Sequence, residues 1–576
     1  MSSFYTDASL VLIPSGIKDQ KVYCAKPVDG TGDLSFSRAS NATRVNSSGL
    51  VERVRENLIL QSNSFDTTWV NDDSTETSGQ AGYDGTNNAW LLTKTAANGR
   101  IGQVISVSGS VTFSVYAKAG TDNWVLLASS DANVRAYFNL ASGSIGTTGA
   151  GTRAKISSAG NGWYRCSISG NSSFSYFNIW VADADNDVSG TSGNILIQAS
   201  QVETGDIATD YIATTSSAVS VGPVSGLPRL DYSGGASCPS LLLEPQTTAL
   251  NTNSEVLSNW TQVRATISSN AITSPDGYQN ADGIVASTAN DDHFISQNIA
   301  VTAIPYTFSA FVKKGSKNWV RLWETSTNVS VDFNLETGAT GTTVGSVTSK
   351  GTQDYGNGWL RCYITYTATA GTNAFRVYAM EADNDKTFIG DGSTVDIYVW
   401  GINLTATSYL QSYIPTLSTA VTRVADTASK TGISSLIGQT EGTLFVEFDF
   451  NGNYDANGIV AIDILGAGGN EAYIFITGGG QLRLELYVAS VIQGLITTSI
   501  GAVGRKKIAF AYKANDFVGY MNGVQIGTDT SGTVGAMDTV YVGTYQSATY
   551  AAGNMNQTLL FKTRLSNTDL ATLTTI

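Results

Sequence analysis

Alternating apolar and polar residues predict β-strands in many parts of the chain. From Thr112 to Lys118 every second residue is apolar, namely Phe113, Val115 and Ala117. This period of two is typical of a strand that buries one face. The same alternation recurs at 163–168 and 442–450, and Gly, Asn and Ser separate the segments. The pattern predicts an all-β protein built of β-sandwiches.

One long pattern occurs twice. Trp124 and Trp319 lie 195 positions apart (319 − 124), and each follows an asparagine. The other matched segments keep their order, with only small changes in spacing. They are Thr112–Gly120 with Thr307–Gly315, Phe138–Leu140 with Phe333–Leu335, Gly160–Cys166 with Gly356–Cys362, Ala184–Asp187 with Ala382–Asp385, and Tyr211–Ile212 with Tyr413–Ile414. Such a series indicates a tandem domain duplication, and we expect both copies to share one strand topology.

The repeats and the composition between them suggest the domain boundaries. We expect jelly-roll domains at 57–221 and 240–426, a linker rich in Gly and Pro at 222–239, and a third sandwich at 427–576. Residues 1–56 are polar apart from a short apolar strand candidate at 8–14, and they show no extended core pattern. We interpret them as an arm that attaches the chain to other proteins. A segment that is disordered until it docks is the alternative.

Two local signals refine the third sandwich. Asn522-Gly523 lies between two apolar runs and predicts a tight β-hairpin. Ser566 and Asp569 resemble a capping box with Asp in place of Glu, so we expect a short helix at the carboxyl end.

Charge and cysteine content narrow the class of protein. The formal net charge is −14 and the pI is about 4.6, which argues against nucleic acid or an anionic membrane as partner. No apolar run is long enough for a membrane helix, and the amino terminus lacks the positive region of a signal peptide. Cys166 and Cys362 are equivalent positions on inward faces, so we expect core thiols and no disulfide for them or for Cys24 and Cys238.

Several motifs resemble those of bacteriophage virion proteins. The segments Phe36–Leu50 and Cys238–Gln246 are similar to segments common in such proteins. Both repeats resemble their carbohydrate-binding-module-like jelly rolls, through Phe-Ser-x-x-x-Lys and Gly-Asn-Gly-Trp-x-Arg-Cys. The region from about Thr440 resembles a laminin-G/concanavalin-A-like domain, through Ala511–Phe517, Asn522-Gly523 and Thr563–Ser566. The resemblance implies three β-sandwiches on a virion surface, but fold alone does not assign a ligand.

Aromatic residues on the predicted outer faces are the first candidate site. They are Trp163 and Trp180 in the first repeat, and Trp359 and Tyr378 in the second. Sugar rings stack their apolar faces on exposed aromatic rings, so these four residues are candidate carbohydrate-binding residues. The alternative is that the rings pack under neighbouring loops or against another subunit.

Acidic clusters after one strand of each repeat are the second candidate. Alternating carboxylates could bind Ca²⁺, which takes about six to eight oxygen ligands. The candidate ligands are Asp183, Asp185 and Asp187 in the first repeat, and Asp383 and Asp385, in a cluster with Glu381, in the second. Asp and Asn are also good turn residues, and the spacing lacks the rest of an EF-hand, so a turn is the preferred interpretation.

Catalysis has little support in the sequence. His293 is the only histidine, which excludes a multi-histidine metal site and leaves one isolated candidate for a Ser–His–Asp arrangement. A pair of carboxylates for glycoside hydrolysis stays open, because such pairs can come from distant strands.

The combined hypothesis is a non-enzymatic phage protein made in the host cytoplasm and exposed on the virion. It would be a tail fibre or tail-associated adhesin that binds host or environmental glycans and contacts other virion proteins through residues 1–56. A homo-oligomer is compatible with this role. A head fibre or capsid decoration protein is the alternative, and a polysaccharide depolymerase is a third class.

Overall fold

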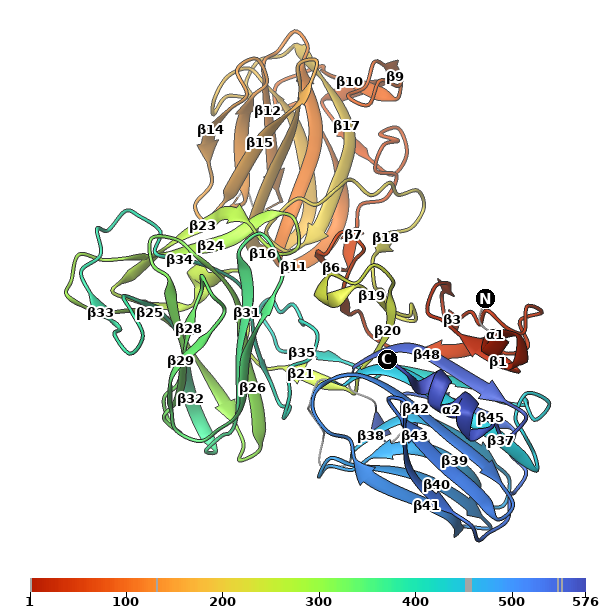
Figure 1. The fold of residues 1–576 in the computed structure, drawn as a ribbon. Helices are drawn as coiled ribbons and strands as arrows, with labels where there is room; N and C mark the ends of the chain where they lie inside the picture. The colour runs from red at the N-terminus through yellow and green to blue at the C-terminus, as the bar shows by residue number, and fades with distance from the viewer. Residues whose placement is uncertain (1–2, 131–132, 451–457, 546–548, 551–552) are drawn as a thin grey trace. The chain divides into compact units, whose positions relative to one another are not determined.

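The computed structural model is built almost entirely of antiparallel strands (Figure 1). It describes residues 3–130, 133–450, 458–545, 549–550 and 553–576. The chain forms two compact units, Val54–Gly222 and the combination of Met1–Arg53 with Pro223–Ile576. The all-β sandwich prediction is confirmed.

The first unit is a sandwich around the predicted first repeat. Two strands of 20 residues, β11 and β16, pair along most of their length and join the main strands of this unit into one ten-stranded sheet. Its core contains Phe113, Val115, Cys166 and Ile168, as the alternation predicts. The other strands are β7 (Arg55–Asn57), β8 (Val70–Asp72), β9 (Ser74–Gln80), β10 (Ala89–Lys94), β12 (Trp124–Ser129), β13 (Arg135–Asn139), β14 (Ser144–Thr148), β15 (Arg153–Gly160), β17 (Gly193–Thr204) and β18 (Val219–Val221), with β11 at Arg100–Ala119 and β16 at Trp163–Ala182.

The second repeat forms a sandwich of two separate sheets in the other unit. One sheet has the order β23-β24-β34-β26-β31-β30, and the other has the order β22-β25-β32-β27-β28-β29. The bounds are β21 (Thr247–Ala249), β22 (Thr261–Val263), β23 (Ala265–Thr273), β24 (Gln279–Ala286), β25 (Asp291–Val301), β26 (Pro305–Lys314), β27 (Trp319–Glu324), β28 (Val329–Asn334), β29 (Thr340–Val344), β30 (Val347–Asp354), β31 (Trp359–Thr367), β32 (Gly371–Met380), β33 (Thr387–Phe388), β34 (Ile397–Thr405) and β35 (Val421–Arg423).

Both repeats have the same strand order. The carboxyl half of β11 lies between β16 and β17, as β26 lies between β31 and β34. The amino half of β11 lies between β8 and the end of β16, as β25 lies between β22 and β32. Each long strand of the first repeat therefore corresponds to two strands of the second, and the shared topology is confirmed.

The Gly-Asn-Gly motif forms the same left-handed turn in both repeats. Gly160, Asn161 and Gly162 all have positive φ, between 52° and 87°, and Gly356, Asn357 and Gly358 match them at 50° to 79°. Three successive left-handed residues require Gly or Asn, because other side chains pay a steric cost there. The motif therefore makes the turn that leads into the Trp-x-Arg-Cys strand.

The carboxyl-terminal sandwich consists of two large sheets. One has the order β19-β20-β48-β37-β42-β43-β44, and the other has the order β2-β3-β4-β36-β45-β38-β39-β40-β41, where β2 is Ile17–Lys18, β3 is Lys21–Val22 and β4 is Leu34–Ser37. The bounds are β19 (Leu230–Asp231), β20 (Ser240–Leu243), β36 (Thr427–Lys430), β37 (Glu441–Phe450), β38 (Ile459–Gly466), β39 (Asn470–Ile476), β40 (Gln481–Val488), β41 (Val491–Ser499), β42 (Gly504–Lys513), β43 (Asp516–Met521), β44 (Val524–Asp529), β45 (Thr539–Val542), β46 (Thr544–Tyr545), β47 (Thr549–Tyr550) and β48 (Gly553–Phe561).

The two local signals in this sandwich are confirmed. Asn522 and Gly523 have positive φ and connect β43 to β44. Helix α2 (Asn567–Thr574) begins after Ser566, whose hydroxyl accepts a hydrogen bond from the Asp569 backbone N–H. The buried side chain of Leu570 packs on the outer face of the sheet with Val518.

The first 53 residues differ most from the expectation. They contain α1 (Ser3–Asp7), β1 (Leu10–Leu12), β2 (Ile17–Lys18), β3 (Lys21–Val22), β4 (Leu34–Ser37), β5 (Thr43–Val45) and β6 (Val51–Arg53). Strand β1 pairs with β48, and β4 pairs with β36. Leu12 and Phe36 lie in the core of the carboxyl-terminal sandwich. The segment is therefore part of the carboxyl-terminal sandwich and not a separate arm without a core. The sequence did not reveal this, because the partner strands lie hundreds of residues away. Attachment to other proteins stays a prediction.

The expected linker is also ordered, because a buried ionic network fixes it. Arg229 Nη1 lies 2.7 Å from Glu244 Oε2, and its other terminal nitrogen pairs with Asp426. Arg38 Nη1 lies 3.0 Å from Asp426 Oδ1, and Arg423 Nη1 lies 2.7 Å from Glu244 Oε2. All five side chains are buried. Burial alone would raise the pKa of Glu244, but Arg423 and Arg229 lower it to about 2. We call these five residues the arginine hub.

Cys166 and Cys362 lie where the alternation places them. Cys166 and Cys362 are buried at equivalent positions, and burial raises the pKa of both thiols. Cys24 is also buried, whereas Cys238 is exposed. No helix among the described residues is long and apolar enough to cross a membrane.

Candidate functional site

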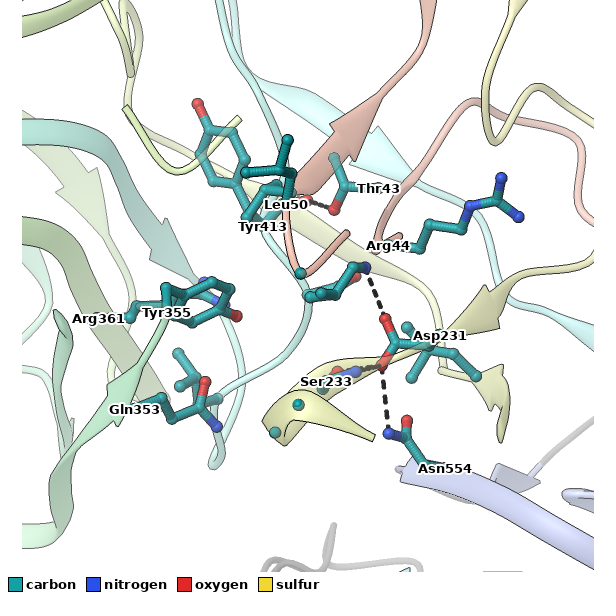
Figure 2. A pocket seen from close by; sticks show the side chains of 18 of the residues that line it. Thr43, Arg44, Leu50, Asp231, Ser233, Gln353, Tyr355, Arg361, Tyr413 and Asn554 are labelled. Atoms are coloured by element: carbon teal, nitrogen blue, oxygen red, sulfur yellow. Dashed lines mark hydrogen bonds between the residues drawn. The ribbon is translucent and has the colours of Figure 1, made fainter. Parts of the chain in front are cut away.

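A pocket of about 770 Å³ opens beside the arginine hub, inside the unit that holds the second repeat (Figure 2). Its size falls in the range of about 300–1,000 Å³ typical of ligand sites. It is lined by residues of 43–51, 231–235, 353–361 and 409–413, by Leu242 and Glu244, and by the ends of β37 and β48. The two segments that resemble phage virion proteins, Phe36–Leu50 and Cys238–Gln246, both contribute residues.

One wall of the pocket comes from the hairpin that joins β30 to β31. Gln353, Tyr355 and Asn357 are exposed or half-buried there, and Figure 2 shows Gln353 and Tyr355 on the same side as Arg361. The Tyr355 ring packs edge-on against Phe311, with 4.8 Å between ring centroids. Burial raises the pKa of the Tyr355 phenol, so it stays a neutral hydrogen-bonding group.

Arg361 is a buried cation behind this wall. Its Nη1 donates to the Gln411 carbonyl at 2.7 Å, and its guanidinium lies 5.1 Å from the Phe311 ring centre. Burial lowers the pKa of Arg361. Arg165 repeats the arrangement in the other domain, because it donates to Ser114 and lies 5.5 Å from the Tyr116 ring centre. The arginine of the shared motif therefore braces the sheet in both repeats.

The opposite wall is built around Asp231. Its Oδ1 accepts the Val45 N–H at 2.7 Å, and its Oδ2 accepts from Ser233 N at 3.1 Å and Asn554 Nδ2 at 3.3 Å. Thr43 Oγ1 donates to the Tyr413 carbonyl at 2.5 Å, and Leu50 also lines the pocket. The pocket thus combines fixed polar groups with apolar and aromatic surface.

The four aromatic candidates are not exposed as expected. Trp163, Trp359 and Tyr378 are 1%, 2% and 0% exposed. The alternation placed them on the outer faces correctly, but other segments cover those faces. Trp359 packs with Val51 and Ile272 and donates its Nε1–H to the Thr273 carbonyl at 3.1 Å. The prediction that these three rings are accessible is therefore wrong.

Trp180 is the one candidate ring that is only half-buried. The Arg100 guanidinium lies 4.3 Å from its ring centre, and Arg100 also pairs with Asp72. A cation–π contact already occupies this ring. Carbohydrate binding at Trp180 stays a prediction.

The candidate calcium ligands accept hydrogen bonds from backbone N–H groups. Asp185 Oδ1 accepts the Thr147 N–H at 2.6 Å, and Asp383 Oδ1 accepts the Thr342 N–H at 2.7 Å. The other three carboxylates accept from nearby backbone N–H groups: Asp183 from Gly190, Asp187 from Ser189 and Asp385 from Thr387. The described part of the chain contains no group of three or more His, Cys, Asp or Glu placed to hold a metal ion.

His293 does not form a triad. Its Nδ1 lies 2.6 Å from the Arg264 carbonyl and its Nε2 lies 2.9 Å from the Phe388 carbonyl, inside the second repeat. Both ring nitrogens contact the backbone, so this histidine braces the fold.

The pocket itself was missed from the sequence. It depends on contacts between segments more than 300 residues apart, such as Asp231 with Asn554 (323 residues) and Thr43 with Tyr413 (370 residues). A usable signal was present, because Arg38, Arg229 and Arg423 stand in chain segments with few other charges. Arginine is the residue best suited to buried ion pairs.

No protein-family model matches the chain, and no curated protein sequence matches it. Solved structures with similar folds include the CBM40 domain of Ruminococcus gnavus IT-sialidase (15% identity, 24% of this chain and 86% of that chain, TM-score 0.21). Another is the CBM22-1–CBM22-2 tandem domain of Paenibacillus barcinonensis Xyn10C (12% identity, 62% and 98%, TM-score 0.21). Domains LG4-5 of the mouse laminin α1 chain are also similar (11% identity, 48% and 85%, TM-score 0.17). These likenesses do not assign the chain to a family.

Proposed function

We propose that this chain is a non-enzymatic surface protein that binds glycans through the pocket beside the arginine hub. The observation that carries the proposal is the lining of the pocket. Tyr355 and Leu50 offer apolar surface, and Gln353, Asn357 and Asn554 offer amide groups at its rim. Sugars need this combination, because their rings have apolar faces and their edges carry hydroxyl groups.

The virion setting is part of the proposal. The segments that resemble phage virion proteins supply the arginine hub with Arg38 and Glu244, and they supply the pocket with Leu50. This placement supports a tail fibre or tail-associated adhesin on a phage particle. Several copies in a virion would raise weak single-site binding by factors of roughly 10²–10⁴ through avidity.

A head fibre or capsid decoration protein is the second candidate. The observation that favours it is the burial of Trp163, Trp359 and Tyr378. Buried rings stabilise the repeats and do not contact a ligand, as we expect of modules that serve particle stability. Antibody labelling of whole virions separates the two positions. Label at the tail supports the adhesin, and label spread over the capsid supports decoration.

Binding in the pocket is tested by adsorption of the full chain to host cells. The double substitution Gln353→Ala with Asn357→Gly removes two rim amides, and glycine keeps the positive φ of 50° at position 357. Tyr23→Ala is the matched control, because Tyr23 is 39% exposed and does not line the pocket. We expect the pocket variant to lose adsorption while it stays folded, and the control to adsorb normally. Equal adsorption by both variants would contradict the proposal. Shortening of host capsule by the unmodified chain would contradict the non-enzymatic part.

A further inference from the structure

We propose that the outer face of strands β38, β39 and β40 in the carboxyl-terminal sandwich is a second saccharide-binding site, separate from the pocket. Its members lie at outward positions on three adjacent strands. They are Asp463 on β38, Tyr473 and Phe475 on β39, and Arg483, Glu485 and Tyr487 on β40. We call these six residues the tyrosine–carboxyl face.

Alternation fixes the direction of these side chains. Ile462 and Ile464 lie in the sandwich core, so Asp463 between them points to the opposite face. Across the ladder Asp463 pairs with Tyr473, and Tyr473 pairs with Glu485. The three residues therefore form one row across the sheet.

The aromatic rings form a half-buried surface. The centroids of Tyr473 and Tyr487 are 6.0 Å apart with an interplanar angle of 23°, and Phe475 meets Tyr473 edge-on at 6.1 Å. Both tyrosine hydroxyls donate to Glu485 Oε2, that of Tyr487 at 2.7 Å, and these bonds hold the rings in place. Arg483, about one third exposed, pairs with the same carboxylate. Rings held in this way suit the apolar face of a sugar.

The buried carboxyls are the independent sign of a ligand. Asp463 and Glu485 are both 0% exposed on a face where a sheet usually carries solvated polar groups. Apart from the adjoining Glu471 carboxyl, neither oxygen of Asp463 has a hydrogen-bond partner among the described residues. Burying a carboxyl with so few hydrogen-bond partners costs free energy. Departures from the usual burial of polar groups are found mostly at functional sites.

The chemistry of the face favours a polyhydroxylated ligand. Burial, and then Glu471, raise the pKa of Asp463, so its carboxyl carries a proton and has both a hydrogen-bond donor and an acceptor beneath the rings. On β40, Glu485 offers hydrogen-bond acceptors and Arg483 offers donors. A saccharide uses donors, acceptors and ring faces together, whereas a metal ion or a polyamine would use only the acids.

The test is a glycan array probed with the full chain, the pocket variant Gln353→Ala/Asn357→Gly, and two variants of the face. Tyr487→Ala removes a half-buried ring, and Glu485→Gln keeps the size of a buried side chain and removes its charge. Lys513→Ala is the control, because that side chain is 55% exposed on the other sheet. Circular dichroism checks that every variant is folded.

We expect a set of glycans whose binding falls about tenfold or more in both Tyr487→Ala and Glu485→Gln and is unchanged in the pocket variant and in Lys513→Ala. Absence of any such set, including an array with no bound glycan, would overturn the second site. Glycans lost only in the pocket variant report on the pocket, so the two proposals succeed or fail separately.

Discussion

The sharpest structural prediction concerns Leu12, a residue of the amino-terminal segment. It is 1% exposed and packs in the core of the carboxyl-terminal sandwich, on a strand that pairs with β48. Leu→Ala at such a site costs about 2–5 kcal/mol through lost burial and the cavity left behind. Leu12→Ala should therefore destabilise a sandwich that lies more than 400 residues along the chain.

Hydrogen exchange measured by mass spectrometry is the suitable assay. All ten tryptophans lie between Trp69 and Trp400, so tryptophan fluorescence reports on the two repeats and not on this sandwich. A loss of about 2–5 kcal/mol would speed exchange at peptides 441–450 and 481–488 by roughly 30-fold to 5,000-fold, since about 1.4 kcal/mol is a factor of ten. The tryptophan signal of the repeats should stay unchanged.

Val28→Ala is the control within the same segment, because Val28 is 94% exposed. Its effect should stay within about 0.5 kcal/mol. Equal exchange of the sandwich peptides in both variants would refute the claim that the first residues complete this domain.

Three further predictions follow from single residues. Arg229→Met leaves Glu244 and Asp426 buried with fewer cations, and it should lower the stability of its unit by about 3–5 kcal/mol in urea unfolding. Asn161→Ala keeps a β-carbon at a φ of 52° but loses the polar side chain that lets Asn tolerate this left-handed conformation, so it should cost about 1–2 kcal/mol, measured by exchange of peptide 111–119, whereas Asn161→Gly should be nearly neutral. Burial and the adjoining acid raise the pKa of Asp463, so the folded state keeps a proton that the unfolded chain loses above about pH 4. The free energy of unfolding of the sandwich should then fall by about 1.4 kcal/mol per pH unit above that point, until the pH reaches the raised pKa. In Asp463→Asn this group no longer titrates, so we expect that fall to be absent between pH 5 and 8.

Local sequence patterns predicted the elements and the faces of their residues well. The hairpin at Asn522-Gly523 and the cap at Ser566 depend on neighbours within a few positions, and the duplication is found by comparing two stretches of the same chain. The sequence alone therefore contains the information for all three. The direction of Trp359 was predicted for the same reason. Its accessibility was not, because Val51 and Ile272 cover it from other parts of the chain.

Long-range pairing explains the other differences. Leu10–Leu12 reads as a short strand, but its partner β48 lies almost 550 residues away and cannot be found by alternation. The pocket depends on the same kind of contact, since Asp231 meets Val45 and Asn554 only in the folded unit. Single-sequence reasoning therefore located candidate rings but not the surface that is open to a ligand.

The most direct test of glycan binding in the pocket is hydrogen exchange of the full chain with and without a saccharide found on the array. We expect protection in peptides that cover 43–51 and 353–361, because these segments form the walls of the pocket. The pocket variant should show no protection at the same saccharide concentration. Protection confined to other segments, with 43–51 and 353–361 unchanged, would contradict the proposed site.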